Sequence, residues 1–140
     1  MSGPDPEIVK AVTKWLKFAD EDLKLASCAL ASNMNGPYRL IAFHAQQCAE
    51  KCIKAFLIYQ NVDFPYTHNI RRLLKLCGKY ATWAETLVEA EELTPYAITA
   101  RYPGEDEPVS ESEATRAVKI AKSVRETVLR SLEEAGLELR

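Results

Sequence analysis

The sequence contains little of what interrupts helices or marks a special class of protein. Its 140 residues include only five glycines and seven prolines, most of them near expected helix ends. This scarcity excludes collagen-like repeats and argues against a disordered chain. The net charge is −2, so no overall basic field favours nucleic acid as a partner of the whole chain.

Export signals, membrane segments and cysteine motifs are also missing from the sequence. No apolar run approaches the roughly 20 residues that a membrane span requires. The first ten residues are polar and lack the apolar region of an export signal. These features predict a cytoplasmic protein without a membrane segment. The cysteines form no CxxC pair and are expected to be free, buried thiols: Cys28, Cys48, Cys52 and Cys77.

The rest of the composition is that of an ordinary globular protein. Hydrophobic residues make up 47% of the chain and charged residues 27%. A chain of this length fits one domain, and folding can bury roughly two-thirds of the surface of the unfolded chain. We therefore expect a single domain over residues 1–140, with a core that needs neither disulfide nor metal.

Apolar residues recur at spacings of three and four along the first half of the chain, which is the pattern of helices. The first expected helix begins with Asp5 as its N-cap and Pro6 at its first helical position. After a break rich in Asn and Gly, the second helix runs from about Pro37 to Gln60. A third helix is expected to begin with Thr67 as its N-cap and to end at Gly78.

The second half of the chain predicts two more helices. One begins near Thr82 and is ended or kinked by Pro95. An acidic loop, 101–108, follows it, and residues 110–113 form a capping box that starts the last helix, which Gly136 ends. No segment alternates with the period of two that strands require. The sequence therefore predicts an all-α fold, an up-and-down bundle of four to five helices.

The second helix is the most informative segment because it is apolar on two sides. An ordinary surface helix has one apolar stripe, so this helix lies at the centre of the bundle or is shared with a partner subunit. One wide face is apolar: Ile41, Ala45, Cys48, Ala49, Cys52 and Phe56. Four polar residues at spacings of three, four and three form a separate polar stripe: His44, Gln47, Lys51 and Lys54.

Three interpretations of this polar stripe stay open. It can be a solvated face with side chains that extend outward from the edge of the core. It can be an oligomer interface with matched polar groups. It can also be an anion site, in which Lys51 and Lys54 bind phosphate while His44 and Gln47 hydrogen-bond a base or sugar.

Neither a metal nor a cofactor is expected. His44, Cys48 and Cys52 lie four residues apart, but eight residues of helix span about 12 Å, whereas each zinc ligand atom lies about 2.0–2.3 Å from the metal. The sequence has no glycine loop that would hold phosphates and no metalloprotease or nucleophile motif. Glu21 and Asp22 diverge on the first helix and are expected on a solvated face.

Several segments together resemble the HEPN domain, a nucleotide-binding domain named for higher eukaryotes and prokaryotes. The resemblance keeps the order of its pieces and covers nearly the whole chain. The segments that carry it are FHAQQCAEK at 43–51, KAFL at 54–57, FPYTH at 64–68 and the Leu pair at 73–74, flanked by WLKFADEDL at 15–23 and ARYP at 100–103. The resemblance implies a helical bundle that commonly dimerises and acts beside nucleotides or RNA. It also implies a minimal nucleotidyltransferase as partner in a toxin–antitoxin pair.

Catalytic members of that family are metal-independent ribonucleases with an R-x4-6-H motif near the start of the last long helix. The Arg positions an RNA phosphate and the His acts on the 2′-hydroxyl. The counterpart of the Arg here is Arg101, but residues 106–108 are Asp, Glu and Pro where the His is expected. Arg39 and His44 also have an R-x4-H spacing, yet they point about 140° apart around one helix. We therefore predict no catalytic residue.

The sequence thus predicts a non-catalytic HEPN module that binds a nucleotide or partners a nucleotidyltransferase. We expect it to bind no metal and to form a homo-oligomer, most simply a dimer. The alternative is a metal-independent, RNA-cleaving HEPN toxin. His68, at the entry to the third helix, and Tyr102, whose ring can stack on a base, join the candidate residues. The expected ligand contacts are His44, Gln47, Lys51, Lys54, His68, Arg101 and Tyr102.

Overall fold

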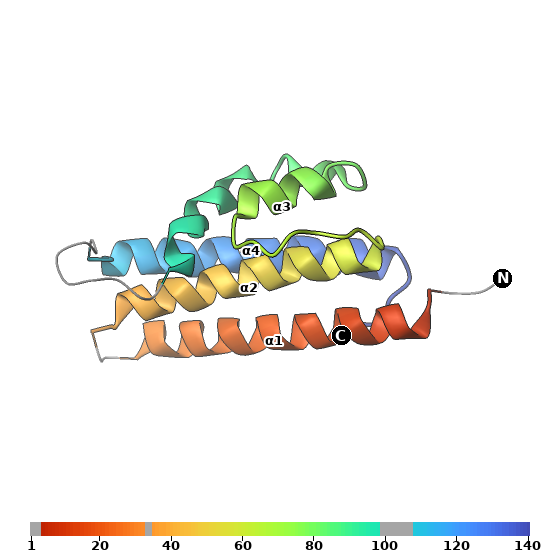
Figure 1. Cartoon of the computed structure of the whole chain (residues 1–140). Coiled ribbons are helices and arrows are strands. Elements are labelled where there is room, and N and C mark those ends of the chain that lie inside the picture. The colour runs from red at the N-terminus through yellow and green to blue at the C-terminus, as the bar shows by residue number, and fades with distance from the viewer. Residues whose placement is uncertain (1–3, 33–34, 99–107) are drawn as a thin grey trace.

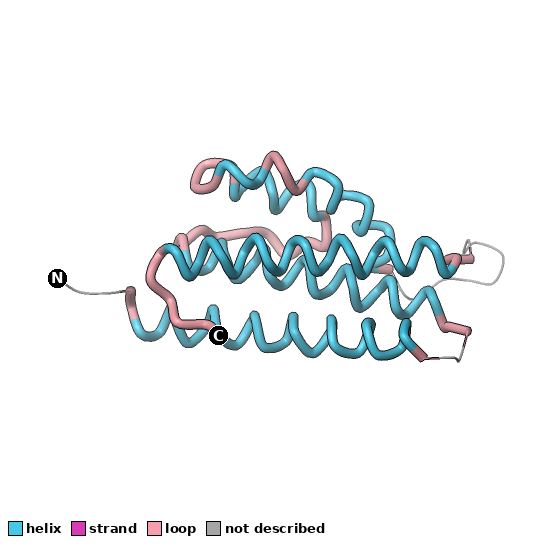
Figure 2. The backbone as a smooth tube through the Cα atoms, turned by 180° about the vertical axis from the view of Figure 1, so that it is seen from behind, coloured by secondary structure: helices cyan, strands magenta, loops and turns pink. Residues whose placement is uncertain are grey.

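The computed structural model describes residues 4–32, 35–98 and 108–140. Within these ranges the chain is helical and forms no strand, which confirms the all-α prediction (Figures 1 and 2). The elements are the helices α1 (Pro6–Ala31), α2 (Tyr38–Tyr59), α3 (Ile70–Cys77) and α4 (Glu111–Glu134), and the 3₁₀ segments η1 (Thr82–Ala84) and η2 (Val88–Ala97).

The three long helices lie side by side, and α3 with the 3₁₀ segments covers one side of them (Figure 1). α1 and α2 are antiparallel, whereas α4 runs in the same direction as α2. Residues 60–69 return along the bundle before α3 begins, so this connection crosses the surface of the bundle. Helical periodicity predicts the helices but does not specify this return.

Helix α2 is the centre of the bundle. It packs against α1, α4, α3 and η2, and 13 of its 22 residues are buried. The apolar face predicted for it is fully buried, from Ile41 through Phe56. Its flank is buried as well and includes polar residues, which distinguishes α2 from an ordinary surface helix. Across the described residues, none of the helices combines the length and apolar character needed to span a lipid bilayer.

Three helix ends follow the expected chemistry. The side chain of Asp5 accepts a hydrogen bond from the backbone N–H of Glu7 at the start of α1. Ser110 and Glu113 form the predicted capping box at the start of α4. Gly136 follows α4 with a φ of +108°, and its left-handed conformation lets the chain turn out of the helix.

The start of α3 differs from the prediction. Asn69, not Thr67, is the N-cap, because its side-chain oxygen accepts from the backbone N–H of Arg72. Thr67 instead accepts from the backbone N–H of Asn69, in a turn that precedes the helix. Both residue types cap helices, so composition alone does not choose between them. The predicted end of α3 at Gly78 is confirmed.

The predicted fourth helix is wrong in type. The segment from Thr82 forms two 3₁₀ pieces, and Pro95 lies inside the second of them instead of ending it. The buried side chains recur every three residues, which matches three residues per turn of a 3₁₀ helix. They are Ala84, Leu87, Ala90 and Leu93.

The cysteines are free, but they are not all buried. Cys48, Cys52 and Cys77 lie in the core, whereas Cys28 on α1 is exposed. Burial raises the pKa of the Cys77 thiol to about 12, so this side chain is a neutral, apolar part of the core. Cys28 lies on the solvent side of α1, outside the apolar stripe that packs on α2.

Candidate functional site

The polar stripe of α2 meets a carboxylate of α1. Nδ1 of His44 lies 2.8 Å from one oxygen of Asp22, and Nζ of Lys51 donates to the other. His44 and Lys51 are half-buried, and the Asp22 side chain is only 12% exposed. We call these three residues the Asp22 cluster. Asp22 was expected on a solvated face, but it lies at the edge of the α1–α2 contact, where it orients both basic side chains.

A second carboxylate, Glu50, lies deeper in the same side of the bundle. Glu50 is 3% exposed, and the buried residues Gln46 and Lys54 lie one helical turn before and after it. One Glu50 oxygen accepts from Gln46 at 3.0 Å and lies 2.7 Å from Nδ1 of His68, and the other accepts from Lys54 at 2.9 Å. Gln47 is linked to this group through a bond to Gln46 at 2.7 Å. Gln46, Gln47, Glu50, Lys54 and His68 form what we call the Glu50 network.

The charge of Glu50 is stabilised by its donors. Burial would raise the pKa of this carboxyl, but hydrogen bonds from Lys54, Gln46 and His68 and the charge of Lys54 outweigh burial and lower it. Glu50 is therefore ionised at neutral pH and can only accept hydrogen bonds. Nδ1 of His68 consequently carries the proton of the bond to Glu50, which leaves its other ring nitrogen available to a ligand.

Three aromatic rings surround the ammonium group of Lys54. Its Nζ lies 5.8 Å from the ring centre of Trp15, 5.6 Å from that of Phe64 and 6.0 Å from that of Tyr66. Trp15 comes from α1, and the other two rings come from the connection between α2 and α3. Cation–π attraction between Lys54 and the rings of Phe64 and Tyr66 thus holds this connection against the bundle. The ion pair with Glu50, on the same helix, keeps the ammonium group in place.

Five of the seven predicted ligand contacts fall into these two groups. His44 and Lys51 belong to the Asp22 cluster, and the Glu50 network holds the other three: Gln47, Lys54 and His68. Arg101 and Tyr102 lie outside the described residues. The residues of the two groups alternate along α2, so the structure places the described candidates beside one another, with Lys54 buried among them.

The sequence interpretation missed the residues that organise this surface, namely Asp22, Gln46 and Glu50. A signal was present for two of them, because Gln46, Glu50 and Lys54 follow one another at spacings of four and therefore share one side of a helix. The burial of that side was not predictable, because Phe64, Tyr66 and His68 of the following connection pack against it, and the path of this connection depends on tertiary packing.

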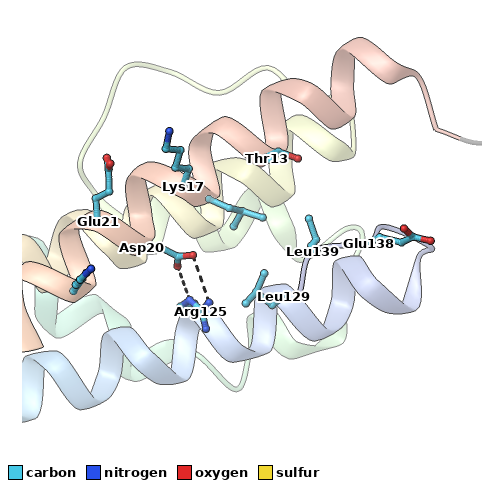
Figure 3. Close-up of a pocket in the computed structure, with 10 residues that line it drawn as sticks. Thr13, Lys17, Asp20, Glu21, Arg125, Leu129, Glu138 and Leu139 are labelled. Carbon is cyan, nitrogen blue, oxygen red and sulfur yellow. Dashed lines mark hydrogen bonds and ion pairs between the residues drawn. The ribbon is translucent and has the colours of Figure 1, made fainter.

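A separate hollow of about 350 Å³ lies between α1 and α4 (Figure 3). Leu16, Leu129 and Leu139 line it, and Arg125 of α4 donates to Asp20 of α1 at 2.6 Å across it. Its rim carries three basic and three acidic side chains, so it has no net charge that would select a ligand. None of the predicted site residues lines it, and we leave it outside the candidate site.

Metal coordination finds no support among the described residues, where no group of three His, Cys, Asp or Glu side chains is placed to hold an ion. The side chains of His44, Cys48 and Cys52 do not converge on one point. His44 turns toward α1 and Asp22, whereas Cys48 and Cys52 lie in the core.

Known proteins support the fold and place the chain in a family. Over 102 residues the chain is 29% identical to "Putative toxin MJ1304" of Methanocaldococcus jannaschii. The aligned region covers 68% of this chain and 65% of that protein. The match thus spans slightly less than two thirds of the relative's length.

Two solved structures resemble the chain over most of its length. ST0689, an archaeal HEPN homologue, has a TM-score of 0.67 and 27% identity and covers 86% of this chain and 96% of its own. TT1696 from Thermus thermophilus has a TM-score of 0.67 and 28% identity, with coverage of 85% and 96%. The family model of the HEPN domain matches residues 12–132, and the chain therefore belongs to the HEPN domain family.

Proposed function

We propose that this chain is a toxin–antitoxin HEPN module that acts by binding, as a homodimer that takes a nucleotide or a nucleotidyltransferase partner. The observation that carries this proposal is the pair of carboxylate-centred groups on one side of α2. They fix three partly exposed basic side chains in place, those of His44, Lys51 and His68. The relative named as a toxin supports the toxin–antitoxin setting.

The dimer is proposed for the face around the Asp22 cluster. Phe18 and Leu25 are exposed on α1, four residues before and three after Asp22, and therefore lie on the same side of the helix as this carboxylate. Leu40 is exposed one turn before His44 on α2. A patch that combines exposed apolar side chains with both signs of charge can match a second copy of itself, as a two-fold interface requires.

The nucleotide is proposed for the Glu50 network. His68 is the described candidate with the most exposed side chain, and its ring is fixed by Glu50. Lys51 and Lys54 are already ion-paired, so a phosphate at either lysine would have to compete with Asp22 or Glu50. This competition favours recognition of the base and sugar over phosphate binding by the lysines alone.

The second candidate function is RNA cleavage, and the toxin name of the archaeal relative is the observation that favours it. The chain has only two histidines, His44 and His68, and each is held through Nδ1 by a carboxylate. A carboxylate that fixes a ring nitrogen is compatible with acid–base chemistry. The family's own Arg and His pair is incomplete in this sequence after Arg101, which makes binding without catalysis our first choice.

The dimer proposal predicts that charges on the apolar patch separate the two copies. The double variant Phe18→Glu, Leu25→Glu places two carboxylates beside Asp22 and should sediment as a monomer. Val88→Glu, on the exposed part of η2, is the matched control and should keep the wild-type mass. A wild-type mass of 15.7 kDa by sedimentation equilibrium at high micromolar concentration would contradict the proposal.

The binding proposal predicts a saturable rise in melting temperature with at least one ribonucleotide. At a ligand concentration one hundred times its Kd, the expected stabilisation is about 2.7 kcal/mol. The measurement is a thermal melt against each ribonucleoside monophosphate and triphosphate, with inorganic phosphate at the same ionic strength as control. Unchanged melting with every nucleotide would remove nucleotide binding from the proposed function.

The proposal of binding without catalysis predicts that RNA stays intact in the presence of the protein. A labelled single-stranded RNA incubated with the protein and a chelator should show no fragments on a denaturing gel. Metal-independent cleavage that disappears in His44→Ala or Arg101→Ala, and persists in the exposed control variant Lys119→Ala, would instead establish the alternative function.

A further inference from the structure

Tyr66 is the most exposed of the large hydrophobic side chains that the structure describes. It lies in the connection between α2 and α3, and 93% of its surface is accessible. Its ring nevertheless has defined neighbours, because it meets the His68 ring edge-on at a centroid distance of 5.6 Å and lies 6.0 Å from the ammonium group of Lys54. The protein thus holds a flat aromatic ring at its surface and leaves most of that ring uncovered.

The neighbouring imidazole is held more firmly than its exposure suggests. The His68 side chain is 44% exposed, but its Nδ1 lies 2.7 Å from the buried carboxylate of Glu50. Its backbone carbonyl accepts from Gln46 at 3.2 Å, and Gln46 is fully buried. Both the ring and the backbone of His68 are therefore fixed by α2. Among the described residues, nothing hydrogen-bonds to its second ring nitrogen, which can serve a ligand beside Tyr66.

Helix α3, which begins two residues after His68, carries two basic side chains without ion-pair partners among the described residues. Arg72 and Lys75 are exposed on α3 and three residues apart, so their side chains are neighbours on the helix surface. Neither side chain has an ion-pair partner in the described part of the chain. Lys51 and Lys54, by contrast, are already paired with Asp22 and Glu50. An anionic group can therefore bind Arg72 or Lys75 without displacing a carboxylate.

We infer that Tyr66, His68 and Arg72 form a subsite for one nucleotide unit. The base stacks on the open face of the Tyr66 ring, the second nitrogen of His68 hydrogen-bonds its edge, and the phosphate meets Arg72 with Lys75 beside it. Stacking on an aromatic ring next to a basic helix face is how proteins hold an unpaired nucleotide. This inference rests on the proposed nucleotide binding and gives it a location that the polar stripe of α2 does not cover.

A free nucleotide and a single-stranded RNA both offer a base and a phosphate to this subsite, and two probes distinguish these ligands. AMP and a short single-stranded RNA are each titrated against the full chain, with ribose 5-phosphate as the ligand that lacks a base. If the natural ligand is a strand, the RNA binds more tightly than AMP and its affinity falls more steeply with salt. If the natural ligand is a free nucleotide, AMP and the RNA bind with similar affinity.

The variants test the residues. Tyr66→Ala should weaken whichever probe binds by at least about fivefold, since stacking is lost. Tyr66→Phe keeps the ring and should bind like the wild type. Tyr80→Ala removes another exposed tyrosine near the end of α3 and is the matched control. Because Tyr66 is almost fully exposed, its variants should fold normally, which circular dichroism checks. Arg72→Ala should weaken binding and reduce its salt dependence.

The outcomes separate this subsite from the proposed function. Nucleotide binding that Tyr66→Ala leaves unchanged would overturn the subsite and leave the proposed function standing. Ribose 5-phosphate that binds as well as AMP would also overturn it, because the base would then contribute nothing. If the wild-type protein bound neither AMP nor RNA, both the subsite and the nucleotide-binding part of the proposed function would be removed.

Discussion

The buried carboxylate of Glu50 is the interaction on which the rest of this surface depends. Transfer of an ionised carboxylate into a protein interior costs several kcal/mol unless it is paired and hydrogen-bonded. Lys54, Gln46 and His68 meet this need with hydrogen bonds of 2.7–3.0 Å. Two of these donors come from α2 itself, but His68 comes from the connection to α3. The requirement to satisfy one charge therefore binds a surface segment to the central helix.

This constraint explains how the basic side chains of this surface are held in position. Lys54 is neutralised by Glu50 and covered by aromatic rings, so it contributes position more than free charge. Asp22 likewise holds His44 and Lys51 in position through ion pairs. What is left accessible is the exposed part of three basic side chains, the apolar residues of α1 and the ring of Tyr66. These accessible groups are the ones that we propose for a second subunit and for a nucleotide.

Much of the fold could be predicted from the sequence because its signals are local. The helix starts at Asp5 and Ser110 follow from capping chemistry, and the double burial of α2 follows from apolar residues on two of its sides. The 3₁₀ segments were missed because a spacing of three is also part of the α-helical pattern. The site was predicted only in part, since the basic residues were identified without their carboxylates. Glu50 could not be recognised as buried, because the segment that covers it packs there through tertiary contacts.

The most direct test of the central claim is the free energy of unfolding of Glu50→Gln between pH 3 and pH 8. The folded-state pKa of Glu50 lies below its ordinary value of 4.5, so its contribution is present above that pH and is lost as the pH falls through the folded-state pKa. We predict that Glu50→Gln is less stable than the wild type by about 3 kcal/mol at pH 7, because Lys54 is left buried without its partner, and that the difference shrinks in acid. The double variant Glu50→Gln, Lys54→Met should recover part of this loss, and Glu85→Gln, on an exposed side chain, should change little. If Glu50→Gln were as stable as the wild type at pH 7, with the same pH dependence, the ionised Glu50 carboxylate would not be the interaction that stabilises this surface.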